Sequence, residues 1–346
     1  MNPLIKKITC LALAGLLVFS ATACGNKEPK EPGKKENEKG KVTVLKANQP
    51  VNPTHPYQLG LEKFAELIKE KTDGRYQIDI YHSGQLGDER SSIENLQMGS
   101  LDIAVCSTGP MGGFLPDFQV LDLPFLFESY EQADKVLEGP VGDQLLAKLK
   151  DLGIVGCAFE ENGFRVLTTS EKWGPVKTLD DLKGLKIRTQ ENEVHMEAFK
   201  LLGADPTPMS WSEVFTQLQN GGLDAQENPV PILYNNKINE VQKYVSMTRH
   251  LYSPALFLIS QKTFDQLSPE DQKIFLECAK ASAKYEKEQI RLQEKEQISK
   301  LKDLGMVFNE PDIGPFKDAV KPVYEKYQGK FDLEIMKAIS DAVQSK

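Results

Sequence analysis

Residues 180–190, DDLKGLKIRTQ, join a short helical turn, Gly184 and a short β-run that ends at Arg188. A charged side chain at the end of a strand, directly before a turn, extends past the edge of the sheet. Ligands of α/β sheets bind at that edge, and the planar guanidinium of arginine matches a carboxylate better than an ammonium does. The stretch therefore predicts a site for a small organic carboxylate at Arg188.

Alternating strand and helix patterns precede this stretch. Apolar or alternating runs predict strands at residues 42–48, 76–82 and 102–106. The spacing of apolar residues predicts helices at 57–71 and 88–98, the second with Asp88 as its N-cap. This order is typical of the α/β class, with a mostly parallel sheet and right-handed crossovers.

A second series has the same plan, with strand and helix patterns at residues 185–188, 193–202, 205–209, 212–220 and 224–226. Because 346 residues exceed one ordinary hydrophobic core, we expect two lobes. The first comprises residues 42–164 and about 253–290, and the second comprises 165–252 and about 291–346. Further short strand patterns cover 154–158, 164–168, 241–247 and 255–259, and the last two are expected to return toward the first lobe.

A long helical pattern begins at Ser268 as N-cap with Pro269 at the first helical position, and it ends at Gly305. Some 35 residues correspond to a rod of about 50 Å, so we expect a brace that spans both lobes. Most of residues 286–296 are charged, and this part of the helix is expected to be solvated. A coiled coil is the alternative, but apolar heptads are not sustained.

The N-terminus has the pattern of a secretion signal, residues 1–23, with Lys6 and Lys7 before an apolar run that is too short to span a bilayer. Small residues directly before Cys24 are typical of a bacterial lipoprotein, in which Cys24 is lipidated, although Ala21 stands where such motifs usually carry leucine. Cleavage after Ala23 by an ordinary signal peptidase is the alternative. Residues 24–41 are predicted to be a flexible tether.

Composition excludes several classes of function. A formal net charge of −8 argues against a nucleic-acid partner, which requires a basic surface. The four histidines are not in metal-ligand spacing, and no nucleotide-binding or nucleophile motif is present. Glu160 and Glu161 would point to opposite faces of a strand, which argues against a shared acid–base pair. We therefore expect neither an enzyme nor a protein with a metal or other cofactor.

Beyond the first 24 residues the chain has three cysteines, Cys106, Cys157 and Cys278, which are not in C-x-x-C spacing. Each lies in an apolar run, so we expect buried thiols rather than a disulfide framework.

Three further residues have the right chemistry for an anion site. Arg165 alternates with apolar residues in a strand pattern, where a cation needs a partner; a structural carboxylate is the alternative to a ligand. Trp211 follows two prolines and either covers a ligand or fills core. Asn228, before Pro229, either binds the ligand or serves as a turn residue.

Together these stretches resemble the extracytoplasmic solute receptors of TRAP (tripartite ATP-independent periplasmic) transporters, of the DctP type. The matching motifs are YHSGQLGDER (81–90), MGSLDIAV (98–105), LDLPFLF (121–127), NGFRVLTT (162–169), LKGLKIRTQ (182–190), PMSWSEVFTQLQNGGLDAQENP (208–229) and HLYSPALFLIS (250–260). The resemblance implies a two-lobe clamp of the periplasmic-binding-protein kind, with hinge strands and a long helix across both lobes. It also implies that Arg188 pairs with the ligand carboxylate, with Arg165 as a second cation, Asn228 as a hydrogen-bonding partner and Trp211 in the pocket wall.

From the first lobe, the resemblance implies that Asn48 and Glu89 reach polar groups of the ligand. Ser107 is a further candidate contact, and it stands where sialic-acid-binding members carry an acid, which disfavours sialate as the ligand. Ala225 replaces a usual glycine. C4-dicarboxylates, keto acids, hydroxy acids, sugar acids and aromatic acids all remain possible ligands.

The resemblance further implies an extracytoplasmic protein that delivers its ligand to a TRAP membrane permease and that is held at the membrane by the lipid on Cys24. Two alternatives from other classes stay open. The same clamp could report its ligand to a sensor kinase, or the protein could be a surface enzyme.

Overall fold

The computed structural model describes residues 42–327 and 329–344. Within them, nine strands form one sheet in the order β2-β1-β3-β8-β4-β7-β5-β6, with β9 paired to β8. The strands are β1 (Thr43–Asn48), β2 (Tyr76–Tyr81), β3 (Ile103–Ser107), β4 (Ile154–Thr169), β5 (Lys186–Thr189), β6 (Asp205–Pro208), β7 (Ala225–Pro229), β8 (Tyr244–Ser260) and β9 (Val307–Asn309). The predicted signal peptide, Cys24 and the tether lie outside the described residues.

Two parallel groups, β2-β1-β3 and β7-β5-β6, stand on either side of the antiparallel pair β4 and β8. The prediction of an α/β clamp with a mostly parallel sheet is confirmed. The predicted lobe boundaries stay a prediction, and they fall inside β4, β8 and the long helix, which all pass continuously from one group to the other.

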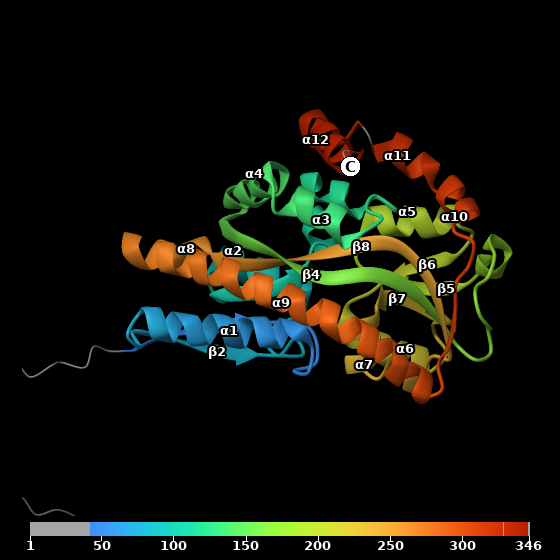
Figure 1. The fold of residues 1–346 in the computed structure, drawn as a ribbon, viewed down its shortest axis with the longest axis horizontal. Coiled ribbons are helices and arrows are strands. Elements are labelled where there is room, and N and C mark those ends of the chain that lie inside the picture. Colours follow the sequence, from blue (N-terminus) through green and yellow to red (C-terminus); the bar gives the residue numbers. More distant parts are fainter. Residues whose placement is uncertain (1–41, 328, 345–346) are drawn as a thin grey trace, which may run out of the picture. The chain divides into compact units, whose positions relative to one another are not determined.

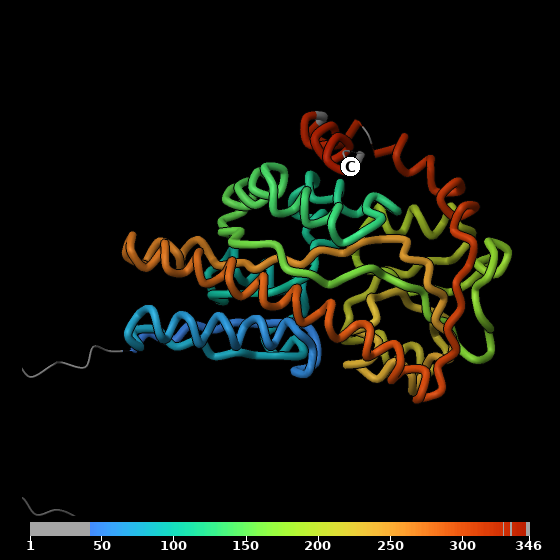
Figure 2. The backbone as a smooth tube through the Cα atoms, viewed as in Figure 1, coloured from blue at the N-terminus to red at the C-terminus, as the bar shows by residue number. Residues whose placement is uncertain are grey.

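The expectation of two short strands in each crossing segment was wrong. Each segment forms one strand, β4 of 16 residues and β8 of 17, and the two run side by side through the middle of the molecule (Figures 1 and 2). Register shifts between Gly156 and Ala158, Glu161 and Gly163, and Arg165 and Leu167 interrupt their pairing. These β-bulges break the period-two alternation, which explains why each strand looked like two in the sequence.

Helices cover both faces of the sheet. The helices are α1 (Pro56–Lys71), α2 (Glu89–Met98), α3 (Tyr130–Leu137), α4 (Pro140–Lys148), α5 (Glu193–Leu201), α6 (Trp211–Gln219), α7 (Val230–Asn235), α8 (Gln261–Phe264), α9 (Pro269–Asp303), α10 (Gly314–Ala319), α11 (Lys321–Tyr327) and α12 (Leu333–Gln344). Apolar residues of α2, α3, α4 and α5 share one core, and α1 packs with the first half of α9 in another. Neighbouring residues of β8 alternate between them, with Leu256 in the first and Phe257 in the second.

The caps of two helices are as predicted. The Asp88 carboxylate accepts a hydrogen bond from the Ser91 amide at 2.8 Å, and the Ser268 hydroxyl accepts one from the Asp271 amide at 3.1 Å. No helix in the described part of the chain is long and apolar enough to cross a membrane.

The middle of α9 is only partly solvated, which corrects the prediction for residues 286–296; Glu288, Leu292 and Glu296 are exposed as expected. Glu286 and Lys287 are buried because α9 passes over β4 at this point (Figure 1). The Arg291 guanidinium pairs with Glu161 of β4 at 2.6 Å and with Asp134 of α3 at 2.8 Å. These charged side chains form a network that joins α9, β4 and α3. Their residue types alone do not show whether they lie in such a network or on a solvated helix face.

Two acids at this crossing predict a dependence of stability on pH. Glu160 and Glu286 are fully buried, and both Glu160 oxygens lack a hydrogen-bond partner. Burial raises the pKa of Glu160 to about 8, opposed by the charge of Lys287. The folded protein therefore holds a proton between about pH 4.5 and 8 that the unfolded chain releases. The free energy of unfolding should fall as pH rises through this window, by at most about 1.4 kcal/mol per pH unit for one proton.

Thermal or denaturant unfolding at pH 5 and pH 8 checks this expectation. Glu160→Gln should weaken the dependence, because the amide does not titrate, while Glu286, whose pKa burial also raises, keeps its own contribution. Glu70→Gln on the exposed face of α1 should leave the dependence unchanged. An equal pH dependence in wild type and Glu160→Gln would contradict the assignment.

Candidate functional site

A cleft of about 390 Å³ lies at the carboxyl ends of the parallel strands, where the α/β architecture predicts a ligand. One wall includes Pro50 after β1 and Glu89 at the start of α2. The other includes Arg188, Gln190 and Trp211. A smaller cavity of about 20 Å³ adjoins it and shares Glu89, Arg188, Gln190 and Trp211.

Arg188 is the charged centre of this cleft. Its side chain is 3% exposed, and its Nε and Nη2 donate to the Met209 carbonyl at 2.9 and 2.7 Å. Burial, together with the nearby charge of Arg165, lowers the pKa of Arg188 to about 10, so it stays charged at neutral pH. No acid in residues 42–327 or 329–344 forms an ion pair with it. The charges of Glu227, Glu89 and Glu191 act on it without direct contact. A buried cation that lacks an ion-pair partner favours an anionic ligand.

Trp211 begins α6 and lines the cleft beside this cation. The Arg188 guanidinium carbon lies 5.6 Å from the centre of the Trp211 ring, within range of a cation–π interaction. Its ring also packs against residues of the core. The two alternatives for Trp211 are therefore combined in one side chain, which joins core and cleft wall.

Arg165 pairs with a structural carboxylate, which was one of the two alternatives for its partner. It is fully buried, forms a close ion pair with Glu227 and donates from Nη2 to Oε1 of that residue at 2.7 Å. Burial alone would raise the pKa of Glu227, but the Arg165 charge and the hydrogen bonds from His250 and Arg165 hold it well below its usual range. Arg165 is not among the residues that line the cleft, and its Nη1 is buried without a partner. A contact between Nη1 and the ligand stays a prediction.

Glu89 and Ser107 meet on the opposite wall. Oε1 of Glu89 accepts hydrogen bonds from the Ser107 amide at 2.6 Å and hydroxyl at 2.7 Å. Burial raises the pKa of Glu89, while the hydrogen bonds from Ser107 and the charge of Arg188 oppose this rise. Glu89 lines both cavities and Ser107 lines the smaller one, and the contact of either residue with a ligand stays a prediction.

Asn48 does not line either cavity. Its side-chain amide donates to the Gly87 carbonyl at 2.9 Å and the Ser92 hydroxyl at 2.8 Å, and its oxygen accepts from the Leu86 amide at 3.3 Å. In this structure Asn48 therefore holds the loop that leads to Glu89, and a direct contact with the ligand stays a prediction.

Asn228 lines the smaller cavity, together with two residues that the sequence did not single out, Tyr57 and Asn162. The Asn228 amide donates to Oε1 of Gln226 at 2.8 Å. The Tyr57 hydroxyl and the side-chain amide oxygen of Asn162 are buried without a hydrogen-bond partner. Tyr57 lies inside a helical pattern and Asn162 in a β-bulge, so no periodic signal marked either residue.

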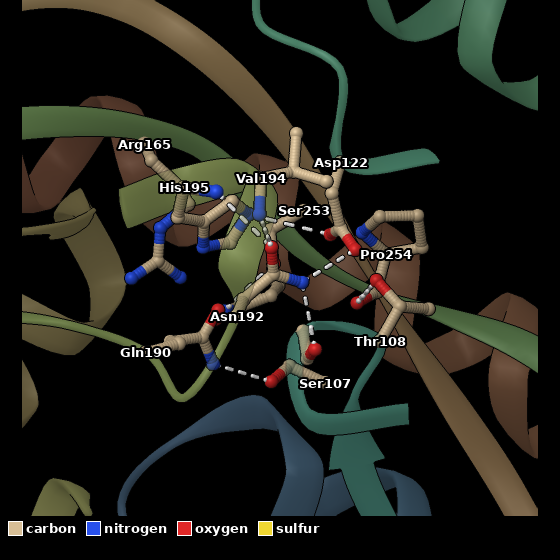
Figure 3. A network of polar contacts seen from close by, with 12 residues as sticks. Ser107, Thr108, Asp122, Arg165, Gln190, Asn192, Val194, His195, Ser253 and Pro254 are labelled. Atoms are coloured by element: carbon tan, nitrogen blue, oxygen red, sulfur yellow. Dashed lines mark hydrogen bonds and ion pairs between the residues drawn. The ribbon is translucent and has the colours of Figure 1, made fainter. Parts of the chain in front are cut away.

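A second group of polar side chains adjoins the cleft (Figure 3). The Asn192 oxygen caps α5 by accepting from the Val194 and His195 amides at 2.9 and 3.1 Å. Its NH₂ donates to the Gly109 carbonyl at 2.8 Å and to Asp122 at 2.7 Å. One side chain therefore joins the start of α5 to the loop after β3.

The described chain contains no group of three or more histidine, cysteine or acidic residues that could hold a metal ion. Cys106, Cys157 and Cys278 are free and buried, as predicted.

A continuous α/β clamp with an unpaired arginine in its cleft defines a binding protein for small anions. The chain belongs to bacterial extracellular solute-binding protein family 7 (DctP), whose model matches residues 47–330. It is therefore an extracytoplasmic solute receptor of the TRAP type, as its resemblance implied. The family consists of binding proteins rather than enzymes, which confirms that prediction.

Three similar proteins bind or are named for sugar acids. The 2,3-diketo-L-gulonate-binding periplasmic protein of Escherichia coli is 36% identical over 311 residues, which cover 90% of this chain and 89% of the relative. A TRAP solute-binding protein from a Polaromonas species, bound to D-erythronate, is 39% identical with a TM-score of 0.85, and the match covers 88% of this chain and all of that one. The sugar-acid-binding protein of Advenella mimigardefordensis, in complex with galactonate, is 33% identical with a TM-score of 0.85, covering 88% and 98%.

Proposed function

We propose that this receptor captures a hydroxylated monocarboxylate, of the sugar-acid or hydroxy-acid class, and delivers it to a TRAP membrane permease. The observation that carries the proposal is the buried, unpaired guanidinium of Arg188 at the cleft. The ligand carboxylate pairs with Arg188, and Trp211 covers the carbon chain. Asn228 and the Nη1 of Arg165 are the proposed additional donors.

The buried charges at the cleft favour one carboxylate over two. Glu227 neutralises Arg165, which leaves Arg188 as the buried cation that needs an anion. Glu89 stands on the facing wall with a carboxyl group held by Ser107, a partner for hydroxyl groups and a repulsive neighbour for a second carboxylate. The ligands named for the three similar proteins also carry one carboxylate and several oxygen substituents.

A thermal-shift screen of organic acids tests the proposal, because a ligand that binds only the folded protein raises its melting temperature. We expect D-erythronate or galactonate to raise the melting temperature more than succinate does at equal concentration. Calorimetry on the acids that shift it would then measure the dissociation constants. A shift by succinate alone would contradict a monocarboxylate ligand.

We also propose that Cys24 carries a lipid that anchors the protein to the outer face of the membrane. Small residues before Cys24 support this proposal. Cys24→Ser should move the protein from the detergent phase to the aqueous phase in a phase-separation assay, because the thioether bond to the lipid requires the cysteine sulfur.

Mass spectrometry of the mature N-terminus provides the control for the anchor. A mature protein that begins at an unmodified Cys24 would indicate ordinary signal-peptidase cleavage and would exclude the lipid.

A further inference from the structure

Gln190 joins the two walls of the cleft, although the sequence marked only Arg188 two residues earlier. It is buried and directly follows β5, which ends at Thr189. Its Nε2 donates to the Ser107 hydroxyl at 2.7 Å and to Oε2 of Glu89 at 3.2 Å (Figure 3 shows the bond to Ser107). Ser107 ends β3 and Glu89 begins α2, so these bonds connect β5 to the other parallel group of strands.

The orientation of the Gln190 amide follows from its partners. The acceptor at Glu89 is a carboxylate oxygen, which requires the NH₂ group of Gln190 on that side. The amide oxygen then packs over Gly109, where an added Cβ would lie 2.5 Å from it. The backbone of Gly109 is not in the left-handed region, so its lack of a side chain serves the close approach of Gln190 rather than an unusual turn.

Glu89 is thereby held through both of its oxygens. Oε1 accepts two hydrogen bonds from Ser107, and Oε2 accepts one from Gln190. These three hydrogen bonds fix the rotation of the carboxylate before a ligand arrives. The remaining lone pair, on Oε2, can then accept a hydrogen bond from a ligand hydroxyl group at little further ordering cost.

We propose that Gln190 is a positioning residue for ligand specificity: it fixes the Glu89 carboxylate for the hydroxyl groups of a bound acid. This inference rests on the proposed function, because it concerns the part of the ligand that lies away from Arg188. Gln190 acts through Glu89, while Arg188 holds the carboxylate.

The test compares two acids on wild type and Gln190→Ala. D-erythronate has three hydroxyl groups, and 2-hydroxybutyrate has the same carbon chain with one. Gln190→Ala should weaken binding of D-erythronate about 10- to 100-fold, the range expected for hydrogen bonds to a charged group, and weaken 2-hydroxybutyrate less than threefold. Gln219→Ala, on the exposed side of α6, is the matched control and should change neither value.

A loss of selectivity is the decisive result, since a merely structural role would weaken both acids alike. Equal losses for the two acids, or no loss for D-erythronate, would overturn the role of Gln190 while the proposed function stands. Failure of every acid to bind wild type would instead contradict the proposed function itself.

A second route to the same contact uses Gly109→Ala, which leaves Gln190 in place but occupies the space of its amide oxygen. In the wild-type background this change should also weaken D-erythronate about tenfold or more. In the Gln190→Ala background it should have little further effect, because the clash disappears with the side chain. Equal losses of affinity in both backgrounds would show that Gly109 acts independently of Gln190. That result would contradict the proposed role of the contact between Gly109 and the Gln190 amide oxygen.

Discussion

Arg188→Ala should lose high-affinity binding of every carboxylate while the protein remains folded. Removal of one partner of a buried ion pair typically costs 3–5 kcal/mol, which corresponds to more than a hundredfold in the dissociation constant. The unliganded protein should melt at the wild-type temperature or above it, because Arg188 has no ion-pair partner among the described residues and its burial is itself unfavourable. Calorimetry and thermal unfolding measure the two effects separately.

Two further variants define what Arg188 contributes. Arg188→Lys keeps the charge but cannot donate through a planar fork, so it should bind poorly. Arg90→Ala removes a half-exposed arginine that also lines the cleft and pairs with Glu94, and it should change affinity by less than about threefold, as expected for a screened surface charge. Wild-type affinity in Arg188→Ala would refute the carboxylate site.

Arg165→Ala should have the opposite effect to Arg188→Ala, because its main loss should be in the stability of the fold. The change leaves the carboxylate of Glu227 fully buried without its cation, which typically costs about 3–5 kcal/mol. The free energy of unfolding in denaturant should fall by that amount.

The double variant Arg165→Ala/Glu227→Gln should recover much of the stability, because the amide carries no charge to bury. Its recovered fold would also allow the predicted contact of Arg165 with the ligand to be measured by calorimetry. If Arg165→Ala were as stable as wild type, or if Glu227→Gln gave no rescue, the ion pair would not be the source of the effect.

Arg188 and Arg165 show which features of the site could be predicted from the sequence and which could not. Arg188 was predicted at a strand end, and that strand end opens on the cleft, since strand periodicity and chain order determine this placement. The partner of Arg165 could not be predicted from spacing, because Glu227 lies on another strand 62 residues later. A pairing across strands depends on register, which the sequence of either strand alone does not encode.

Other roles could not be predicted from the sequence for the same reason, because they depend on tertiary contacts. Asn48 was expected in the ligand site, and its contact with the ligand stays a prediction. In this structure its side chain is hydrogen-bonded to Leu86 and Gly87 in the loop after β2 and to Ser92 of α2. Gln190 escaped notice because an amide after a strand has no characteristic pattern. Lys287 and Arg291 looked like residues of a solvated helix face. Tertiary contact gives Lys287 its partners Asp134 and Glu138 at α3, and gives Arg291 the buried Glu161 of β4.

The continuity of β4 and β8 restricts how such a clamp can open. No flexible loop separates the two groups of parallel strands along these segments, so a change in the angle between them must be taken up as extra twist and bend within the strands. Gly163, whose φ of 112° only glycine adopts readily, lies at one of the three register shifts where the pairing of β4 with β8 is already interrupted. Strands bent in this way would resist the change as a spring does, so a ligand that closed the cleft would act against a restoring force from β4 and β8.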